Sequence, residues 1–148
     1  VHRLVEGRLL VLGGIEIPFH LGLDGHSDAD VLTHAIIDAL LGTIGGGDIG
    51  QLFPDSDTQY KDISSLILLE RVREKLEEQQ VSIVNIDAVV MAQQPKLAPH
   101  IPAMRTKLAS VLHLEESAIS VKATTTERLG FVGREEGMAS QAVALVRT

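Results

Sequence analysis

The first residues that could carry chemistry surround His34. The histidine ends the run GHSDADVLTH, with Asp30 four residues before it and Asp38 four residues after it. On a helix these side chains share one stripe, so a carboxylate could accept the proton of one ring nitrogen while the other nitrogen binds a metal. A helix-surface charge ladder is the alternative. His2 is a candidate for a second ligand, and an ordinary terminal histidine is the alternative there.

A second group ends the run KATTTE, where three hydroxyls and a carboxylate follow an apolar segment. Glu127 could hold Mg²⁺, which typically takes one or two carboxylates and fills its other positions with water and substrate phosphates. The threonine hydroxyls and nearby backbone amides could bind phosphate oxygens. Arg134 offers a planar fork that suits a phosphate. An exposed strand edge is the alternative, because threonine favours strands.

Two loops could bind a substrate. His26 and Ser27 precede an expected helix, where free N–H groups could seat a phosphate, and a capping sequence with Ser27 or Asp28 as N-cap is an equal alternative. The run AQQPKL turns at Pro95 and leaves backbone groups that could read the edge of a small base. A plain connecting loop is the simpler interpretation. The sequence lacks the motifs GxxxxGK[ST], GxGxxG and GxSxG, which disfavours P-loop, Rossmann and serine-hydrolase sites.

Composition narrows the chemistry further. The chain has 148 residues, 45% of them apolar, which predicts one domain over residues 1–148. It has no cysteine, so any metal must be held by His, Asp and Glu. A net charge of −7 with three Phe, one Tyr and no Trp argues against a nucleic-acid surface. No run of apolar residues suits a membrane span and no secretory leader is recognisable, so we expect a soluble, intracellular protein.

The elements that must position these residues follow from periodicity and turn residues. Two short strands at 8–12 and 15–19 are split by Gly13-Gly14, which predicts a hairpin. Helices are expected at 31–42, 63–80 and 101–112, and further strands at 81–91, 119–125 and 138–146. This order predicts an α/β (α+β) fold, a mixed β-sheet with helices packed on one face.

Four blocks in this order resemble one known family over essentially the whole chain. They are GHSDADVLTH, GDIGQLFPDSD, QQPKLAPHIPAM and VKATTTERLGFVGR. The family is that of 2-C-methyl-D-erythritol 2,4-cyclodiphosphate synthase. The resemblance implies a homotrimer with active sites between subunits, and a reaction in which 4-diphosphocytidyl-2-C-methyl-D-erythritol 2-phosphate cyclises with release of CMP. A metal-dependent nucleotide-diphosphate hydrolase and a non-catalytic metal or prenyl-diphosphate binding module are the alternatives.

The resemblance also implies two metal ions. A zinc-type ion would be bound by His2 and His34. The family motif is Asp-x-His, and Val1-His2 matches its end, so we expect a truncated N-terminus with the Asp just ahead of Val1. A second ion, Mg²⁺ or Mn²⁺, would be held by Glu127, which together with Thr125 is expected to be catalytic.

The remaining site residues carry over from the same resemblance. Contacts to the methylerythritol phosphate and hydroxyls are expected from His26, Ser27, Asp48, Gly50 and Asp55. The cytosine pocket is expected from Ala92, Pro95, Lys96 and Leu97, and the diphosphate contacts from Thr124 and Thr125. Phe131 and Arg134 match residues that line a cavity on the trimer axis able to hold a prenyl diphosphate. The compartment would be the bacterial cytoplasm, or a plastid stroma or apicoplast.

Overall fold

A long C-terminal strand lies at the centre of the main sheet. The computed structural model describes residues 1–148, and in it β7 (Gly137–Arg147) lies between β1 (His2–Val5) and β5 (Ser82–Met91). The sheet has the order β4-β1-β7-β5-β6, with β4 (Gly22–Leu23) and β6 (Ile119–Thr124) at its edges. Only the pair β5 and β6 is parallel. The sheet is therefore mixed, as predicted.

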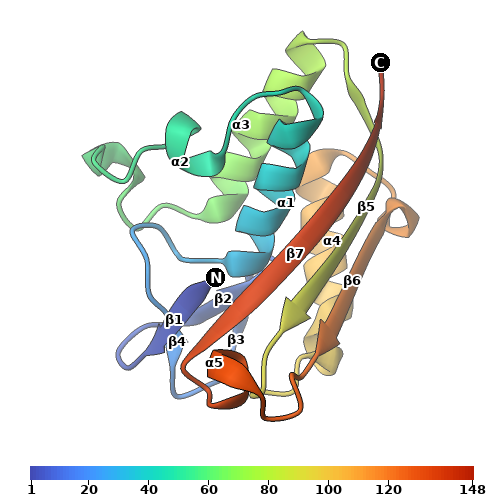
Figure 1. Ribbon diagram of the computed structural model, residues 1–148. Helices are drawn as coiled ribbons and strands as arrows, with labels where there is room; N and C mark the ends of the chain where they lie inside the picture. The colour runs from blue at the N-terminus through green and yellow to red at the C-terminus, as the bar shows by residue number, and fades with distance from the viewer.

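Three long helices cover one face of this sheet (Figure 1). They are α1 (Val31–Thr43), α3 (Ser65–Glu78) and α4 (Ile101–Leu112). Shorter helices are α2 (Ile49–Leu52), α5 (Gly130–Gly133) and the 3₁₀ turns η1 (Thr58–Tyr60), η2 (Ala98–His100) and η3 (Glu116–Ala118). The predicted α/β fold with helices on one face is confirmed. No helix is both long enough and apolar enough to cross a membrane.

The pleat of the sheet separates a buried face from an open one. On β5 the buried side chains are Ile86, Ala88 and Val90, which alternate as a strand requires and face the helices. On the outward face of β7, Val143 is 65% exposed and Leu145 is 59% exposed. No element of this chain covers that outer apolar surface, since all three long helices lie on the other side.

A small hairpin is hydrogen-bonded to the residue that precedes α1. Strands β2 (Leu10–Leu12) and β3 (Ile15–Ile17) pair around Gly13 and Gly14, which have φ of 57° and 73°. This left-handed two-residue turn suits glycine and confirms the predicted hairpin. The N–H groups of the two glycines donate to the Asp30 carboxylate at 3.0 and 2.8 Å.

Asp30 is also the N-cap of α1. Its carboxylate accepts from the Thr33 backbone N–H at 3.0 Å and from the Thr33 hydroxyl at 2.7 Å. The prediction of Ser27 or Asp28 as N-cap was therefore wrong, because the N-cap lies two residues beyond Asp28 and the helix begins at Val31. Burial raises the pKa of Asp30 to about 6, against hydrogen bonds from Thr33 and Gly14 that lower it. Near pH 7 this buried carboxyl is mainly ionised.

Replacing Asp30 with Ala is expected to lower the free energy of unfolding by roughly 2–5 kcal/mol, because buried N–H groups left without an acceptor cost about 1–3 kcal/mol each. Urea unfolding at pH 7 measures the change. The matched control is Asp57→Ala, which removes an N-cap carboxylate from the exposed turn η1. A loss at position 30 no larger than the loss at position 57 would contradict the assigned role.

Most predicted elements lie within a few residues of the observed ones. The helix predicted at 101–112 has the observed bounds, while that predicted at 63–80 is shorter and begins after the N-cap Ser64. Strands β1 and β4 were not predicted. They pair with each other, and β1 also pairs with β7, so they extend the main sheet on one side.

Candidate functional site

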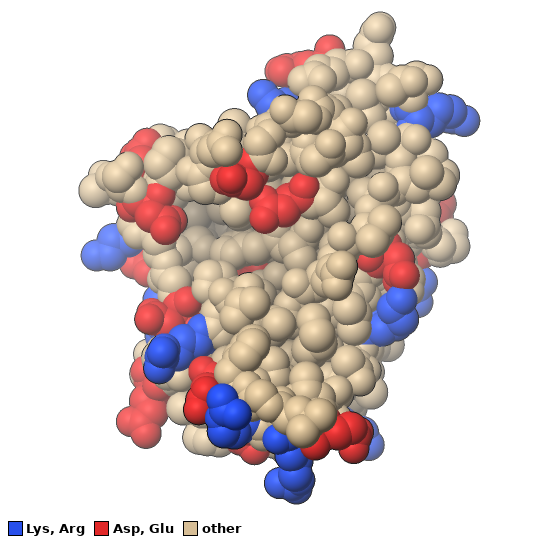
Figure 2. Space-filling model, in the orientation of Figure 1, with Lys and Arg blue, Asp and Glu red and all other residues tan.

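The first of two candidate pockets, the histidine pocket, opens between α1, α2 and β1 and has a volume of about 360 Å³. Figure 2 shows the hollow at the place where Figure 1 puts α1 between α2 and the N-terminus, with acidic side chains on its upper rim. Its lining residues are His2, Gly25, His26, Ser27, His34, Ile49, Gly50, Phe53, Asp55, Tyr60 and Leu68. Six of them, His2, His26, Ser27, His34, Gly50 and Asp55, were predicted from the sequence.

His2 and His34 point ring nitrogens at one another inside this pocket. His2 is held by β1, whose register pairs it with Met138 of β7, and His34 is held by the first turns of α1. His2 Nε2 lies 3.0 Å from His34 Nδ1. Two nitrogens bound tetrahedrally to one zinc ion at about 2.0–2.1 Å are separated by roughly 3.3 Å. The pair therefore fits two positions of a zinc-type ion with little movement.

Two imidazoles are a partial ligand set. No cluster of three or more His, Cys, Asp or Glu side chains in this chain is arranged to hold a metal ion. Burial lowers the pKa of both rings, and the neighbouring His2 adds to the lowering of the His34 pKa to about 4. Both rings are therefore neutral near pH 7, the form in which histidine binds metals.

The second ring nitrogen of His34 contacts hydroxyls. His34 Nε2 lies 2.8 Å from Ser65 Oγ and 3.2 Å from Ser27 Oγ. The prediction that Asp30 or Asp38 would accept its proton was wrong. Asp30 caps α1 and binds the hairpin, and Asp38 accepts from the backbone N–H of Ile49 at 2.8 Å. No local pattern in the sequence pointed to Ser65.

The segment before α1 forms a loop that folds back on its neighbours. Ser27 Oγ accepts from the Ala29 N–H at 3.2 Å, and His26 Nε2 lies 3.2 Å from the carbonyl of Asp57. The Asp30 carboxylate already accepts from the Thr33 N–H at the start of α1, so this N–H is not free to bind a phosphate. His26 and Ser27 nevertheless line the histidine pocket.

Two of the three substrate residues predicted in the loop at 47–57 line the histidine pocket, and the third does not. Gly50 and Asp55 line the histidine pocket. Asp48 does not line it, because its carboxylate is the N-cap of α2 and accepts from the Gln51 N–H at 2.8 Å. Sequence reasoning missed the apolar walls Ile49, Phe53, Tyr60 and Leu68. Phe53 and Tyr60 stack edge to face at 5.4 Å between ring centroids.

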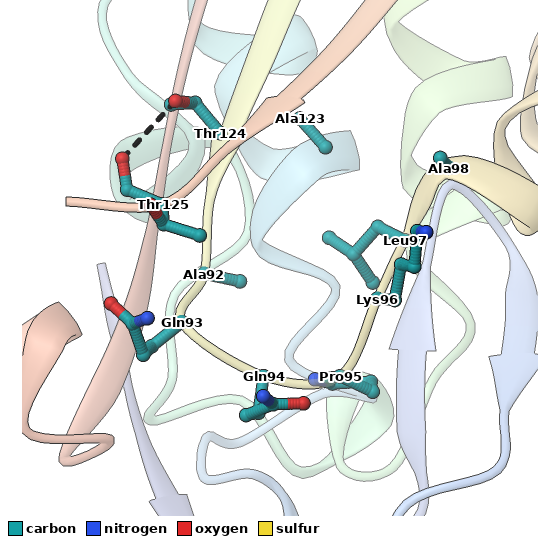
Figure 3. Close-up of a pocket in the computed structure, with 10 residues that line it drawn as sticks. All are labelled: Ala92, Gln93, Gln94, Pro95, Lys96, Leu97, Ala98, Ala123, Thr124 and Thr125. Carbon is teal, nitrogen blue, oxygen red and sulfur yellow. Dashed lines mark hydrogen bonds between the residues drawn. The ribbon is translucent and has the colours of Figure 1, made fainter. Parts of the chain in front are cut away.

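The second candidate pocket, the loop pocket, lies where the parallel strands β5 and β6 end. Its volume is about 430 Å³. In Figure 3 the segment from Ala92 to Ala98 curves around it, with Thr124 and Thr125 on one side and Leu97 and Lys96 on the other. The lining includes all the residues predicted for cytosine and diphosphate contacts, namely Ala92, Pro95, Lys96, Leu97, Thr124 and Thr125. Gln93 and Gln94, which belong to the predicted loop AQQPKL, also line it, together with Ala98 and Ala123.

Glu127 follows this pocket on a left-handed stretch of backbone. Glu127 and Arg128 have φ of 53° and 65°. The Thr125 hydroxyl donates to Glu127 Oε1 at 3.1 Å, and the Arg128 N–H donates to Gln93 Oε1 at 3.1 Å. These contacts tie the turn to the rim of the loop pocket. The side chain of Glu127 is exposed, and its Oε2 makes no hydrogen bond within the chain.

Phe131 and Arg134 lie in neither pocket. Phe131 is on α5 and is 39% exposed. The Arg134 guanidinium donates to both carboxylate oxygens of Glu136, at 3.1 and 3.3 Å. In the single chain the guanidinium of Arg134 is thus paired with the exposed carboxylate of Glu136. The expected role of these two residues toward a prenyl diphosphate stays a prediction.

The two pockets differ in chemistry and share no residue. The histidine pocket offers neutral imidazoles, hydroxyls and apolar walls, which suits a metal ion and a polar, hydroxylated ligand. The loop pocket offers backbone groups, one lysine and threonine hydroxyls, which suits a small flat ring joined to phosphates. One ligand that fills both would need a metal-binding end and a ring-bearing end.

Comparison with known proteins places this arrangement in a family. The protein named 2-C-methyl-D-erythritol 2,4-cyclodiphosphate synthase from Caldicellulosiruptor bescii is 58% identical over 99% of this chain and 93% of its own length. The bifunctional IspDF from Campylobacter jejuni superposes with a TM-score of 0.94 at 47% identity, over 98% of this chain and 39% of that one. The IspF of Plasmodium falciparum in complex with CDP has a TM-score of 0.85 at 34% identity, over 98% of this chain and 89% of that one. The model of the YgbB family matches residues 1–147, and the chain therefore belongs to the YgbB family.

Proposed function

We propose that this protein converts 4-diphosphocytidyl-2-C-methyl-D-erythritol 2-phosphate to 2-C-methyl-D-erythritol 2,4-cyclodiphosphate and CMP. The names of the relatives support this activity, as does the CDP bound to the homologue from Plasmodium falciparum. One observation on this chain carries the proposal. Residues from four separate sequence blocks line two pockets, one with a histidine pair and one with a lysine and threonine hydroxyls.

The reaction is an internal phosphoryl transfer. An oxygen of the 2-phosphate forms a bond to the β-phosphorus, the bond from that phosphorus to its bridging oxygen breaks, and CMP leaves with the oxygen. A phosphate is already an anion near pH 7, so no strong general base is required. The barrier lies in the repulsion between anions and in bringing together two ends of a flexible molecule, where alignment can supply about 7–11 kcal/mol.

The chain's own residues act mainly by positioning. The loop that carries Lys96 would hold the cytosine, and Thr124 and Thr125 would orient the diphosphate. Ser27 and His26 would hold the 2-phosphate end in the histidine pocket. Divalent ions bound by the histidine pair and by Glu127 would neutralise charge on the attacked phosphorus and on the leaving CMP.

The two pockets point to a site completed by a second copy of the chain. They share no lining residue, and the outer face of β7 carries apolar side chains that nothing in the chain covers. Contacts between these faces in a homotrimer would bury Val143 and Leu145, and would allow the histidine pocket of one subunit to meet the loop pocket of its neighbour.

Phosphorus NMR of the protein incubated with the cytidine-diphosphate substrate and Mg²⁺ tests the activity. The expected result is one cyclic diphosphate and one CMP for each substrate consumed. A free monophosphate in place of the cyclic product would instead assign a hydrolase. Binding of the substrate without any release of CMP would assign a non-catalytic module, and either outcome would overturn the proposal.

A further inference from the structure

A buried serine hydroxyl joins the ring of His34 to a carboxylate. Ser65 is the first residue of α3 and its side chain is fully buried, at 0% exposure. Its Oγ lies 2.8 Å from His34 Nε2 and also donates to Asp28 Oδ1. The backbone N–H of Ser65 donates to the other oxygen, Asp28 Oδ2, at 3.0 Å. Asp28 thus accepts hydrogen bonds from both the hydroxyl and the backbone N–H of Ser65.

The protons in this chain of contacts can be assigned from chemistry alone. An ionised carboxylate only accepts hydrogen bonds, so the single hydroxyl proton of Ser65 must point to Asp28. Ser65 Oγ can then only accept from His34, which places the proton of a neutral ring on Nε2. The lone pair of His34 is left on Nδ1, the atom that lies 3.0 Å from His2 Nε2.

We infer that Ser65 is a positioning residue which, anchored by Asp28, fixes the tautomer of His34 so that Nδ1 is free to bind a metal ion. The inference rests on the proposed function in taking His2 and His34 as metal ligands. Metal-bound histidines generally donate their other ring proton to a carboxylate, a carbonyl or water, and this outer contact orients the ring. Here a hydroxyl stands between the ring and the carboxylate.

Ser27 is the rival partner, and its geometry favours a different role. Its Oγ is farther from His34 Nε2, at 3.2 Å, and it already accepts from the Ala29 N–H. If Ser65 receives the Nε2 proton, the hydroxyl proton of Ser27 is free to point into the histidine pocket. If Ser65 lost its hydroxyl, Ser27 could donate to Nε2, and the ring proton would move to Nδ1, where it competes with metal binding.

Zinc affinity measured by competition with a chromogenic chelator tests the inference without any substrate. Ser65→Ala is expected to weaken binding about 10- to 100-fold, the usual cost of losing such an outer partner. Ser64→Ala is the matched control, because Ser64 caps the same helix through its contact with the Leu66 N–H but does not touch His34. It should bind zinc within about twofold of the parent. Equal affinities in the two alanine variants would overturn the inference.

A variant that keeps a hydroxyl at position 65 should keep most of the zinc affinity. Ser65→Thr is expected to bind zinc at least tenfold more tightly than Ser65→Ala, because the hydroxyl that links His34 to Asp28 is kept. A threonine variant as weak as the alanine variant would assign the loss to packing alone and would also overturn the inference.

The tautomer itself is visible by nitrogen-15 NMR of the metal-free protein, and this measurement needs no variant to fold. His34 is expected to carry its proton on Nε2 in the parent protein, and a shift toward Nδ1 is expected in Ser65→Ala. A parent ring protonated mainly on Nδ1 would refute the inference even if CMP release were normal. Conversely, a protein that shows the expected tautomer and zinc affinities but releases no CMP would refute the proposed function alone.

Discussion

Replacing Glu127 with Gln is expected to lower kcat about 10²- to 10³-fold, the usual cost of removing one group that stabilises developing charge. The amide has the shape of the carboxylate and can still accept from the Thr125 hydroxyl, which now lies 3.1 Å from Oε1. It lacks the negative charge that would hold a magnesium-type ion against the substrate phosphates. Because the side chain is exposed, the free energy of unfolding should change by less than about 0.5 kcal/mol.

A continuous assay of CMP release against Mg²⁺ concentration measures this effect, alongside urea unfolding of the same samples. Glu135→Gln is a matched control, since Glu135 is also an exposed glutamate on left-handed backbone, with φ of 60°. It should keep its rate and its magnesium dependence. Full turnover by the Glu127 variant with Mg²⁺ bound would refute the role assigned to this carboxylate.

Replacing Leu145 with Asp is expected to convert the proposed homotrimer to monomers and to lower CMP release more than 10²-fold. The side chain is 59% exposed on the outer face of β7, so a single subunit tolerates the change. In a three-fold interface, three carboxylates would be removed from water without partners, at several kcal/mol each. If each active site combines pockets from two subunits, the separated chains would have no complete site.

Light scattering on an eluting size-exclusion peak gives the mass, and the same fractions can be assayed. Leu9→Asp is the matched control, because Leu9 is 66% exposed but lies outside the sheet. It should remain trimeric and active. An active monomer of the Leu145 variant would show that one chain carries a complete site, and an inactive trimer would show that the outer face of β7 is not the interface.

Elements whose signals are local could be predicted from the sequence. The helix at 101–112 follows a proline and has a regular apolar stripe, and its bounds match the observed α4. The hairpin was predictable because two adjacent glycines select a left-handed turn. Strands β1 and β4 were missed because they are short and owe their existence to pairing with residues far away in the sequence.

The residues of the candidate site were likewise predictable where they adjoin one another in the sequence, and not where distant segments bring them together. The residues around Pro95 adjoin one another in the sequence, and with Thr124 and Thr125 they line the pocket predicted for them. The stripe of Asp30, His34 and Asp38 was misleading, because the spacing that puts side chains on one helix face says nothing about which of them cap the helix. Ser65 could not have been found, since it reaches His34 only through the packing of α3 against α1.

The pairing of the first strand with the last sets an order of assembly. His2 is placed by the register that joins β1 to Met138 of β7, and the two strands lie at opposite ends of the chain. During translation His2 is therefore made well before the strand that anchors it. Contacts so distant along the chain also form slowly. If His2 and His34 bind a metal ion as proposed, the complete pair of ligands should form only after β7 has been made and has paired with β1.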